Sequence, residues 1–195
     1  MITVDAHPTL DLRVLATTWD RPLGENESHQ WLGAPGVLDA RDDLRKPDDE
    51  VKKKVRDLLR HGGFKPAGRS KPCSEYMRKA TEKGAFPRIN TAVDACNLTC
   101  LHGGLPVSMV DRDLVVEPLR VGIAEPETSY VFNASGQEIR LDGLLCLFDA
   151  EGPCANAVKD AQRTKTHPGS TRTLYLIWGT TELPGLADRV FAWYA

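Results

Sequence analysis

Three short polar side chains recur on one side of a helix predicted between residues 91 and 102. Asn90, Asp94 and Asn97 are spaced at i, i+4 and i+7, which brings side chains onto one helix face. Arg88 precedes them and offers a cation to a phosphate. Together these groups form a possible lining for a polar ligand. A structural interpretation is also open, in which Asn90 caps the helix, Asp94 favours its positive end and Asn97 is solvated.

The helix that would position these groups has a start and a stop in the sequence. Asn90 can accept hydrogen bonds from the unpaired amides of the first turn. Gly103 and Gly104 can end the helix in the left-handed conformation, which costs glycine little. Val93, Cys96 and Cys100 fall largely on another face. We expect them to enter the core.

A strongly basic block precedes this helix, although the whole chain of 195 residues has a net charge of only −2. Residues 52–88 contain twelve Lys or Arg and three acidic residues. Such a local excess of cations is expected where phosphates are bound. A solvated helix face is the alternative.

The sequence lacks the common motifs of covalent, nucleotide-dependent and metal-dependent catalysis. It has no Gly-x-Ser-x-Gly elbow, no glycine-rich phosphate loop ending in Lys-Ser or Lys-Thr, and no helix with paired histidines. Its five histidines are scattered and have no obvious acid partner in the sequence. Its five cysteines are odd in number and form no Cys-x-x-Cys pair, so we interpret them as buried, reduced thiols. We expect neither a metal nor a cofactor.

The polar helix and the turn after it resemble the B3/B4 domain, the editing module of the β subunit of bacterial phenylalanyl-tRNA synthetase, which also occurs as freestanding proteins. The motif residues are Asn90, Ala92-Val93-Asp94, Asn97, Gly104-Leu105-Pro106 and Asp111. The resemblance covers about residues 75–178.

Three features depart from the synthetase module. Cys96 stands where the module has a threonine, and Ser108 stands near the place of its histidine. A run of charged and hydroxyl residues from Lys159 to Thr166 replaces a glycine-rich segment and is similar to the freestanding members. The resemblance therefore favours a freestanding member.

The resemblance implies a metal-independent hydrolase that acts in trans on mischarged tRNA. An aminoacyl ester is already activated, so a positioned water can attack it once its carbonyl is polarised. Carboxylates in the site suggest a basic noncognate amino acid, such as canavanine on arginine tRNA, or recognition of the α-ammonium group of any aminoacyl-tRNA. A noncatalytic tRNA- or RNA-binding module is the alternative, and a small-molecule binding protein is a third possibility.

The implied site has two walls. Asn90, Asp94 and Asn97 line the first, and Asp160 in the second completes the catalytic set by recognising a cation on the amino acid. The implied substrate-binding residues are Arg88, Cys96, Glu125, Glu127, Arg163, Thr164, Lys165 and Thr166. A mixed-charge surface loop at 159–166 and a solvated turn at 125–127 are the alternatives.

The remaining pattern predicts helices first and strands mainly later, which indicates an α+β domain. Strands are predicted twice within residues 1–20 and at 107–110, 114–121, 128–132, 138–141, 144–148 and 174–178. Further helices are predicted from Asp48, after a cap at Ser74, and at 183–194. The resemblance implies a more specific architecture, with mixed sheets in a sandwich-like core and helices packed outside. We expect one domain over residues 1–195, with the family-like region at 75–178 between an N-terminal part (1–74) and a C-terminal helix (179–195).

No stretch approaches the ~20 apolar residues of a membrane helix, and the N-terminus does not have the pattern of a signal peptide. We therefore expect a cytoplasmic protein without a membrane partner, a monomer by default. Its expected partner is the aminoacylated 3′ end of tRNA.

Overall fold

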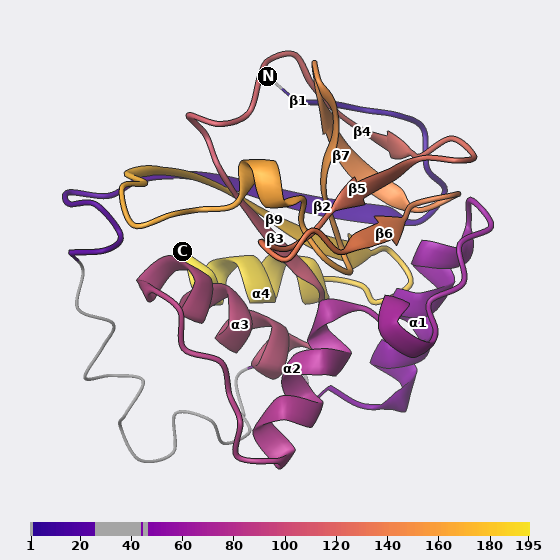
Figure 1. The fold of residues 1–195 in the computed structure, drawn as a ribbon. Coiled ribbons are helices and arrows are strands. Elements are labelled where there is room, and N and C mark those ends of the chain that lie inside the picture. Colours follow the sequence, from indigo (N-terminus) through magenta and orange to yellow (C-terminus); the bar gives the residue numbers. More distant parts are fainter. Residues whose placement is uncertain (1, 26–43, 45–46) are drawn as a thin grey trace.

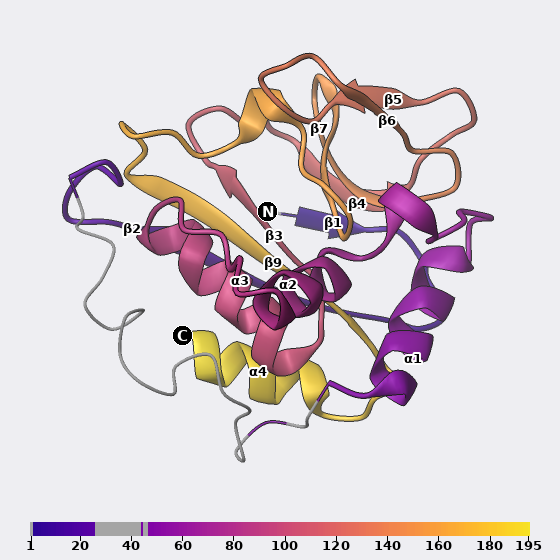
Figure 2. The same ribbon diagram turned by 60° about the horizontal axis from the view of Figure 1, so that its bottom comes forward.

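The computed structural model describes residues 2–25, 44 and 47–195, and its fold is α+β. Two main sheets pack on a shared core, and helices α3 and α4 cover the outer face of one of them (Figures 1 and 2). The fold class predicted from the sequence is confirmed, including the mixed sheets.

The central sheet is antiparallel and has the order β2-β9-β3. Its strands are β2 (Leu10–Thr18), β9 (Arg172–Thr180) and β3 (Val107–Asp111). Because successive side chains of a strand point to opposite faces, β9 contributes to two cores. Leu176 and Trp178 pack toward the second sheet, while Tyr175 and Ile177 pack toward the helices.

The second sheet has the order β1-β4-β7-β8, with β1 parallel to β4 and the other pairs antiparallel. Its strands are β1 (Ile2–Val4), β4 (Leu119–Ile123), β7 (Leu145–Asp149) and β8 (Gly152–Asn156). A separate hairpin joins β5 (Ser129–Val131) and β6 (Glu138–Arg140). Two short 3₁₀ helices, η2 (Gly68–Ser70) and η3 (Gln162–Thr164), lie in the connections.

Helices α1 (Asp49–Arg60) and α2 (Cys73–Glu82) carry the basic block. Asp48 caps α1 by accepting from the amide of Val51 at 2.8 Å. The prediction that Ser74 caps α2 is wrong, because Pro72 holds the cap position and Ser74 is buried inside the helix. Proline is tolerated there because the first amides of a helix have no intrahelical acceptor.

Helices α3 (Thr91–Gly103) and α4 (Leu186–Tyr194) pack on the central sheet and on each other. Asn90 caps α3 by accepting from the amide of Val93 at 3.0 Å, as predicted. Gly104 ends the helix with a φ of 71°. The start and the stop of this helix are therefore confirmed.

Two strand predictions differ from the structure. No strand is predicted from the sequence where β8 lies, and glycine and proline, here Gly152 and Pro153, are more typical of turns. An edge strand tolerates this proline. The strand predicted at 114–121 begins only at Leu119. Among the described residues, no helix is long and apolar enough to cross a membrane.

Candidate functional site

The candidate site lies at the free edge of strand β3. This strand pairs only with β9, so the amides on its other side need other acceptors. Asp160 supplies one of them, because its Oδ2 accepts from the amide of Met109 at 3.2 Å while Oδ1 accepts from the amide of Asn156 at 3.2 Å. One carboxylate thus joins the edge of β3 to the end of β8.

The Asp160 carboxyl has an unusual protonation equilibrium for a group with some solvent exposure. Burial of the carboxyl raises the pKa of Asp160 to about 6. The Ser108 hydroxyl, the two backbone amides and the charge of Lys165 act in the opposite direction but do not cancel it. Titratable groups with shifted pKa values concentrate at functional sites, so Asp160 is the strongest single candidate in the described chain.

A polar network fixes the turn that presents Asp160. Asn156 Oδ1 accepts from the amides of Val158 and Lys159, at 2.8 and 3.0 Å. The carboxamide of Asn156 donates to the Tyr130 hydroxyl, which in turn donates to the carbonyl of Lys159. The turn at 156–160 is therefore held from both strand β8 and the β5–β6 hairpin.

Ser108 anchors the same turn to the core. Its hydroxyl donates to the carbonyl of Asn156 at 2.9 Å and accepts from Trp178 Nε1 at 2.9 Å. Ser108 was noted only as a departure from the family pattern, and Tyr130 and Asn156 were not selected from the sequence. These residues are far apart along the chain, so no local pattern could have identified them.

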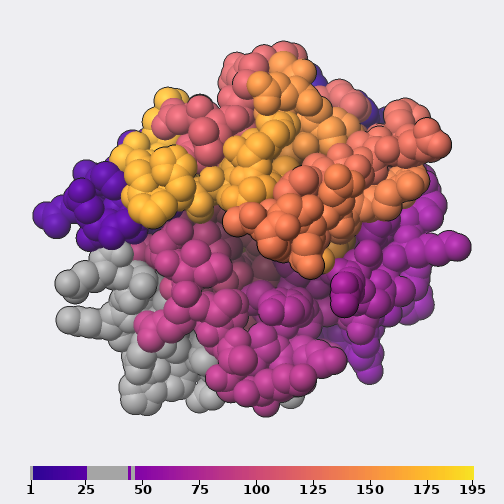
Figure 3. Space-filling view, in the orientation of Figure 1, coloured from indigo at the N-terminus to yellow at the C-terminus, as the bar shows by residue number. Residues whose placement is uncertain are grey.

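Helix α3 approaches Asp160 from the other side. Burial raises the pKa of the Cys96 thiol well above its ordinary value, and the nearby Asp160 charge raises it further. Asn97 follows Cys96 and is partly exposed, and within the described chain its carboxamide has no hydrogen bond. Figure 3 shows a hollow where α2 and α3 meet the 155–170 segment and the β5–β6 hairpin. The structure thus brings Cys96, a predicted substrate-binding residue on α3, close to Asp160, while no contact recorded for the described residues joins Asn90, Asp94 or Asn97 to Asp160.

Lys165 belongs to the same group. Its Nζ donates to the carbonyl of Phe132. Burial lowers the pKa of Lys165, and the charge of Asp160 opposes this effect. Lys165 and Asp160 therefore act on each other across the site.

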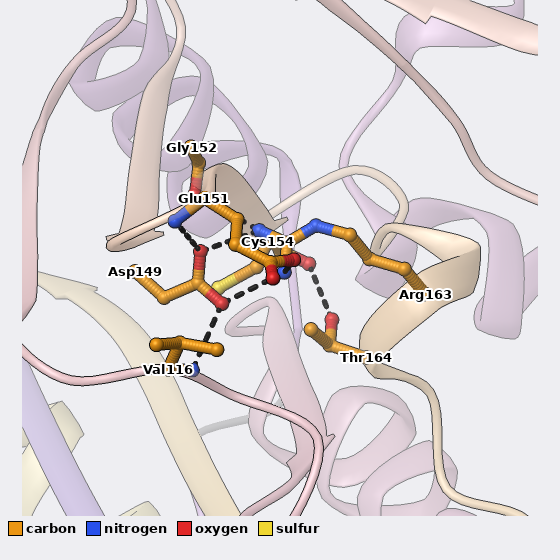
Figure 4. Close-up of polar contacts among 7 residues, drawn as sticks. All are labelled: Val116, Asp149, Glu151, Gly152, Cys154, Arg163 and Thr164. Carbon is orange, nitrogen blue, oxygen red and sulfur yellow. Dashed lines mark hydrogen bonds and ion pairs between the residues drawn. The ribbon is translucent and has the colours of Figure 1, made fainter.

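Arg163, which was predicted to bind substrate, forms an ion pair with Asp149 (Figure 4). Its guanidinium donates to both oxygens of Asp149, at 2.7 and 2.6 Å, and to the carbonyl of Gly152 at 3.1 Å. Burial raises the pKa of Asp149, but the bonds from Arg163 and from the amides of Val116 and Glu151 outweigh it, so the pKa is lowered. This pairing fastens η3 to the turn between β7 and β8.

The two threonines of the predicted second wall differ from each other. Thr164 is fully buried and donates to the carbonyl of Cys154 at 3.1 Å, which gives it a structural role. Thr166 is partly exposed and follows Lys165. Thr166 alone of the two offers surface to a ligand.

The first residues of α3 are more structural than the sequence indicated. The side-chain oxygen of Asn90 accepts the hydrogen bond that caps the helix. Asp94 is fully buried, and its Oδ1 accepts from the amide of Ile89 at 2.8 Å. Arg88 is exposed just before this start. The contacts of Asp94 therefore hold the chain onto the beginning of α3.

Glu125 and Glu127 lie in an exposed turn after β4. Glu127 has a φ of 64°, and its amide donates to Asp142 at 2.6 Å. No contact recorded for the described residues links either glutamate to Asp160, Lys165 or α3. The structure does not bring them into the site, which agrees with the solvated-turn interpretation.

A serine, a histidine and an aspartate do meet elsewhere, near the end of β3. Ser170 donates to Asp111, and His167 Nε2 lies 3.4 Å from the same carboxylate. His167 thus has an acid partner that the sequence did not reveal. The aspartate lies between the serine and the histidine in this chain of contacts. The histidine therefore cannot take the proton of the serine hydroxyl, as it does in a hydrolase triad. This cluster does not form a nucleophile.

Other hollows in the described part of the chain lie away from Asp160. One groove between α1 and α2 is lined by Val51, Val55 and Arg78, among others, and another lies near Lys54, His61 and Glu182. Neither is lined by a predicted site residue. Within residues 2–25, 44 and 47–195, no group of three or more His, Cys, Asp or Glu could hold a metal ion.

The chain was also compared with known proteins. A scan of protein-family models finds no match to this sequence. A search of curated proteins finds no significant match either. The resemblance to the B3/B4 domain therefore stays a prediction that rests on the motif residues.

Proposed function

We propose that this protein is a freestanding deacylase that hydrolyses the ester of a mischarged tRNA, in the cytoplasm and without a metal. The observation that carries the proposal is the position of Asp160, a partly exposed residue whose buried carboxyl has a pKa of about 6, at an edge where α3, β3 and β8 meet. The resemblance of residues 90–111 to an editing module supports the same reaction.

In this reaction the Asp160 carboxylate binds the cationic group of the amino acid. The free carboxamide of Asn97 is available to donate to the ester carbonyl, which stabilises the developing oxyanion. Water adds to the carbonyl carbon, the bond to the ribose oxygen breaks, and that oxygen leaves with a proton. The products are the free amino acid and a tRNA with a free 3′ end. No enzyme-bound intermediate is required.

A panel of aminoacyl-tRNAs tests the proposal. We expect one mischarged species to be hydrolysed and its cognate to be spared, and Asp160→Asn to lose most of this activity. Asp49→Asn is the matched control, because Asp49 is 94% exposed on α1 and its ion pair with Lys52 is 3.7 Å long. Full hydrolysis by folded Asp160→Asn would remove the proposed role of this residue.

A noncatalytic RNA-binding module is the second candidate. It is favoured by cations in the loop before α2 and on that helix, since Lys65, Lys71 and Lys79 are exposed. Salt-sensitive tRNA binding without turnover on any aminoacyl-tRNA would support this module and contradict the deacylase.

A further inference from the structure

Two lysines close to Asp160 in the sequence contact Phe132, and a third cation acts electrostatically on one of them. The Nζ of Lys159 lies 3.9 Å from the centroid of the Phe132 ring, and Lys165 donates to the carbonyl of the same residue. Arg69, which is exposed in η2, acts electrostatically on Lys159, as does Lys165. Two lysine side chains thus meet at Phe132, and the charge of Arg69, from a segment far away in the sequence, lies within electrostatic range of one of them.

No ion pair with a carboxylate is recorded for these three cations among the described residues. Other half-buried cations do have partners: Arg56 donates to both oxygens of Glu75, and Lys54 pairs with Glu182. The fold therefore neutralises these other cations by direct ion pairs, whereas the charge of Asp160 acts on Lys165 without an ion pair recorded between the two.

The group is electrostatically unfavourable as it stands. Burial, together with repulsion from Arg69 and Lys165, lowers the pKa of Lys159, and burial lowers that of Lys165. Contacts within the protein partly stabilise the two lysines. The Phe132 ring attracts the ammonium group of Lys159, and the backbone carbonyl of Phe132 accepts one of the three N–H donors of Lys165. Two donors of Lys165 and the guanidinium of Arg69 are left for an external anion.

We propose that Arg69, Lys159 and Lys165 form an anion subsite that holds a phosphodiester group near the 3′ end of an RNA. A phosphodiester offers charged oxygens to several donors at once and forms strong charge-assisted hydrogen bonds with them. Asp160 lies beside this subsite, so the phosphate and the cationic group of an amino acid would each meet an opposite charge. The identity of the RNA rests on the proposed function.

The test measures binding of an uncharged RNA minihelix ending in CCA, against the same minihelix without its CCA end. We expect Arg69→Gln, Lys159→Met and Lys165→Met each to weaken binding of the CCA-ended RNA about tenfold, since a hydrogen bond between charged groups contributes about 1.5–3 kcal/mol. Binding of the shortened RNA should not change. Arg189→Gln is the matched control, because Arg189 is exposed on α4.

Three results would overturn the subsite. The variants could bind the CCA-ended RNA as the wild type does, they could lose both RNAs equally, or inorganic phosphate could displace the RNA at equal phosphate concentration. Arg69→Gln keeps the test decisive if a lysine variant does not fold, because Arg69 is exposed. The RNA carries no amino acid, so CCA-specific binding without deacylation supports the subsite while contradicting the deacylase.

Discussion

Asp160 combines two opposing influences on one carboxyl group. Two backbone amides favour its charged form, but burial raises its pKa to about 6, above the ordinary value of 3.8. Between these values the folded protein binds a proton that the unfolded chain releases. The free energy of unfolding should therefore fall as the pH rises from about 4 to about 6, by about 3 kcal/mol, and stay level above that.

Asp160→Asn should remove this pH dependence. The carboxamide has no carboxyl proton to release, but it keeps only one acceptor for the amides of Met109 and Asn156. Denaturant unfolding at several pH values between 4 and 7 would measure the change. We expect the difference in unfolding free energy between wild type and variant to shrink as the pH rises through this window. Parallel curves for the two proteins would contradict the assignment.

Arg163 is a structural residue by its contacts, although the sequence placed it in the substrate-binding set. Arg163→Ala would leave Asp149 buried without its bidentate partner, and removing one member of a buried pair costs about 3–5 kcal/mol. We expect a loss near the lower end, because the Arg163 side chain is 32% exposed. Urea unfolding measures the loss, and Arg172→Ala, which breaks an exposed pair with Asp113, is the control.

The sequence identified those parts of the site that depend only on residues close together in the chain. Asn90 was predicted as a cap and is one, because a cap depends on the next three residues. The partners of Asp160 depend on strand pairing between distant segments, so Tyr130 and Asn156 could not be found in this way. Helical spacing placed Asp94 on a polar face, but packing buries that position.

At the scale of elements, α2 and α3 meet at the free edge of β3 through two thiols. Cys73 Sγ lies 3.6 Å from Cys100 Sγ, and it also accepts from the amide of Val107 at 3.4 Å. A disulfide requires an S–S distance of about 2.05 Å, so a small movement of the side chains would bring the sulfurs into bonding range. Both helices would then be joined beside the candidate site.

We expect diamide to convert this thiol pair into a disulfide. The two thiols lose two electrons and two protons, and the azo group of diamide is reduced to a hydrazine. Peptide mapping by mass spectrometry should find the 73–100 link ahead of any other, because these two sulfurs are 3.6 Å apart and Cys73 is partly exposed, whereas the other four cysteines are buried. The link should raise the unfolding free energy by about 3–4 kcal/mol. Equal oxidation of Cys73→Ser and wild type would contradict this.

The helices and strands were predicted best where a residue type marks their ends, as a capping side chain does for a helix. The capped helices α1 and α3 begin within one residue of the positions that the sequence indicated. Strand β8 was missed because it contains the residues that usually mark a turn, and only its pairing with β7 makes it a strand. At β8, pairing with a neighbouring strand therefore outweighs the low strand propensity of glycine and proline.

At the scale of the whole molecule, the structure divides the basic block into two parts. On α1 the cations are paired, with Lys53 and Arg60 bound to Asp57 and Lys54 bound to Glu182. In the loop before α2 and on its exposed side, Lys65 and Lys79 form no ion pair among the described residues. A paired cation offers little net charge to a phosphate, so RNA contact should concentrate on the second part.

Two charge-matched variants test this division. Changing Lys65, Lys71, Lys79 and Lys83 to Gln should weaken tRNA binding and reduce the slope of log K against log salt by up to about 3, since each contact to a single-stranded phosphate contributes about 0.7. Changing Lys52, Lys53, Lys54 and Arg60 to Gln removes the same charge from α1 and should change the slope much less. Fluorescence anisotropy between 50 and 200 mM salt resolves such differences. Equal losses in the two variants would show that net charge alone, and not its arrangement on the fold, attracts the RNA.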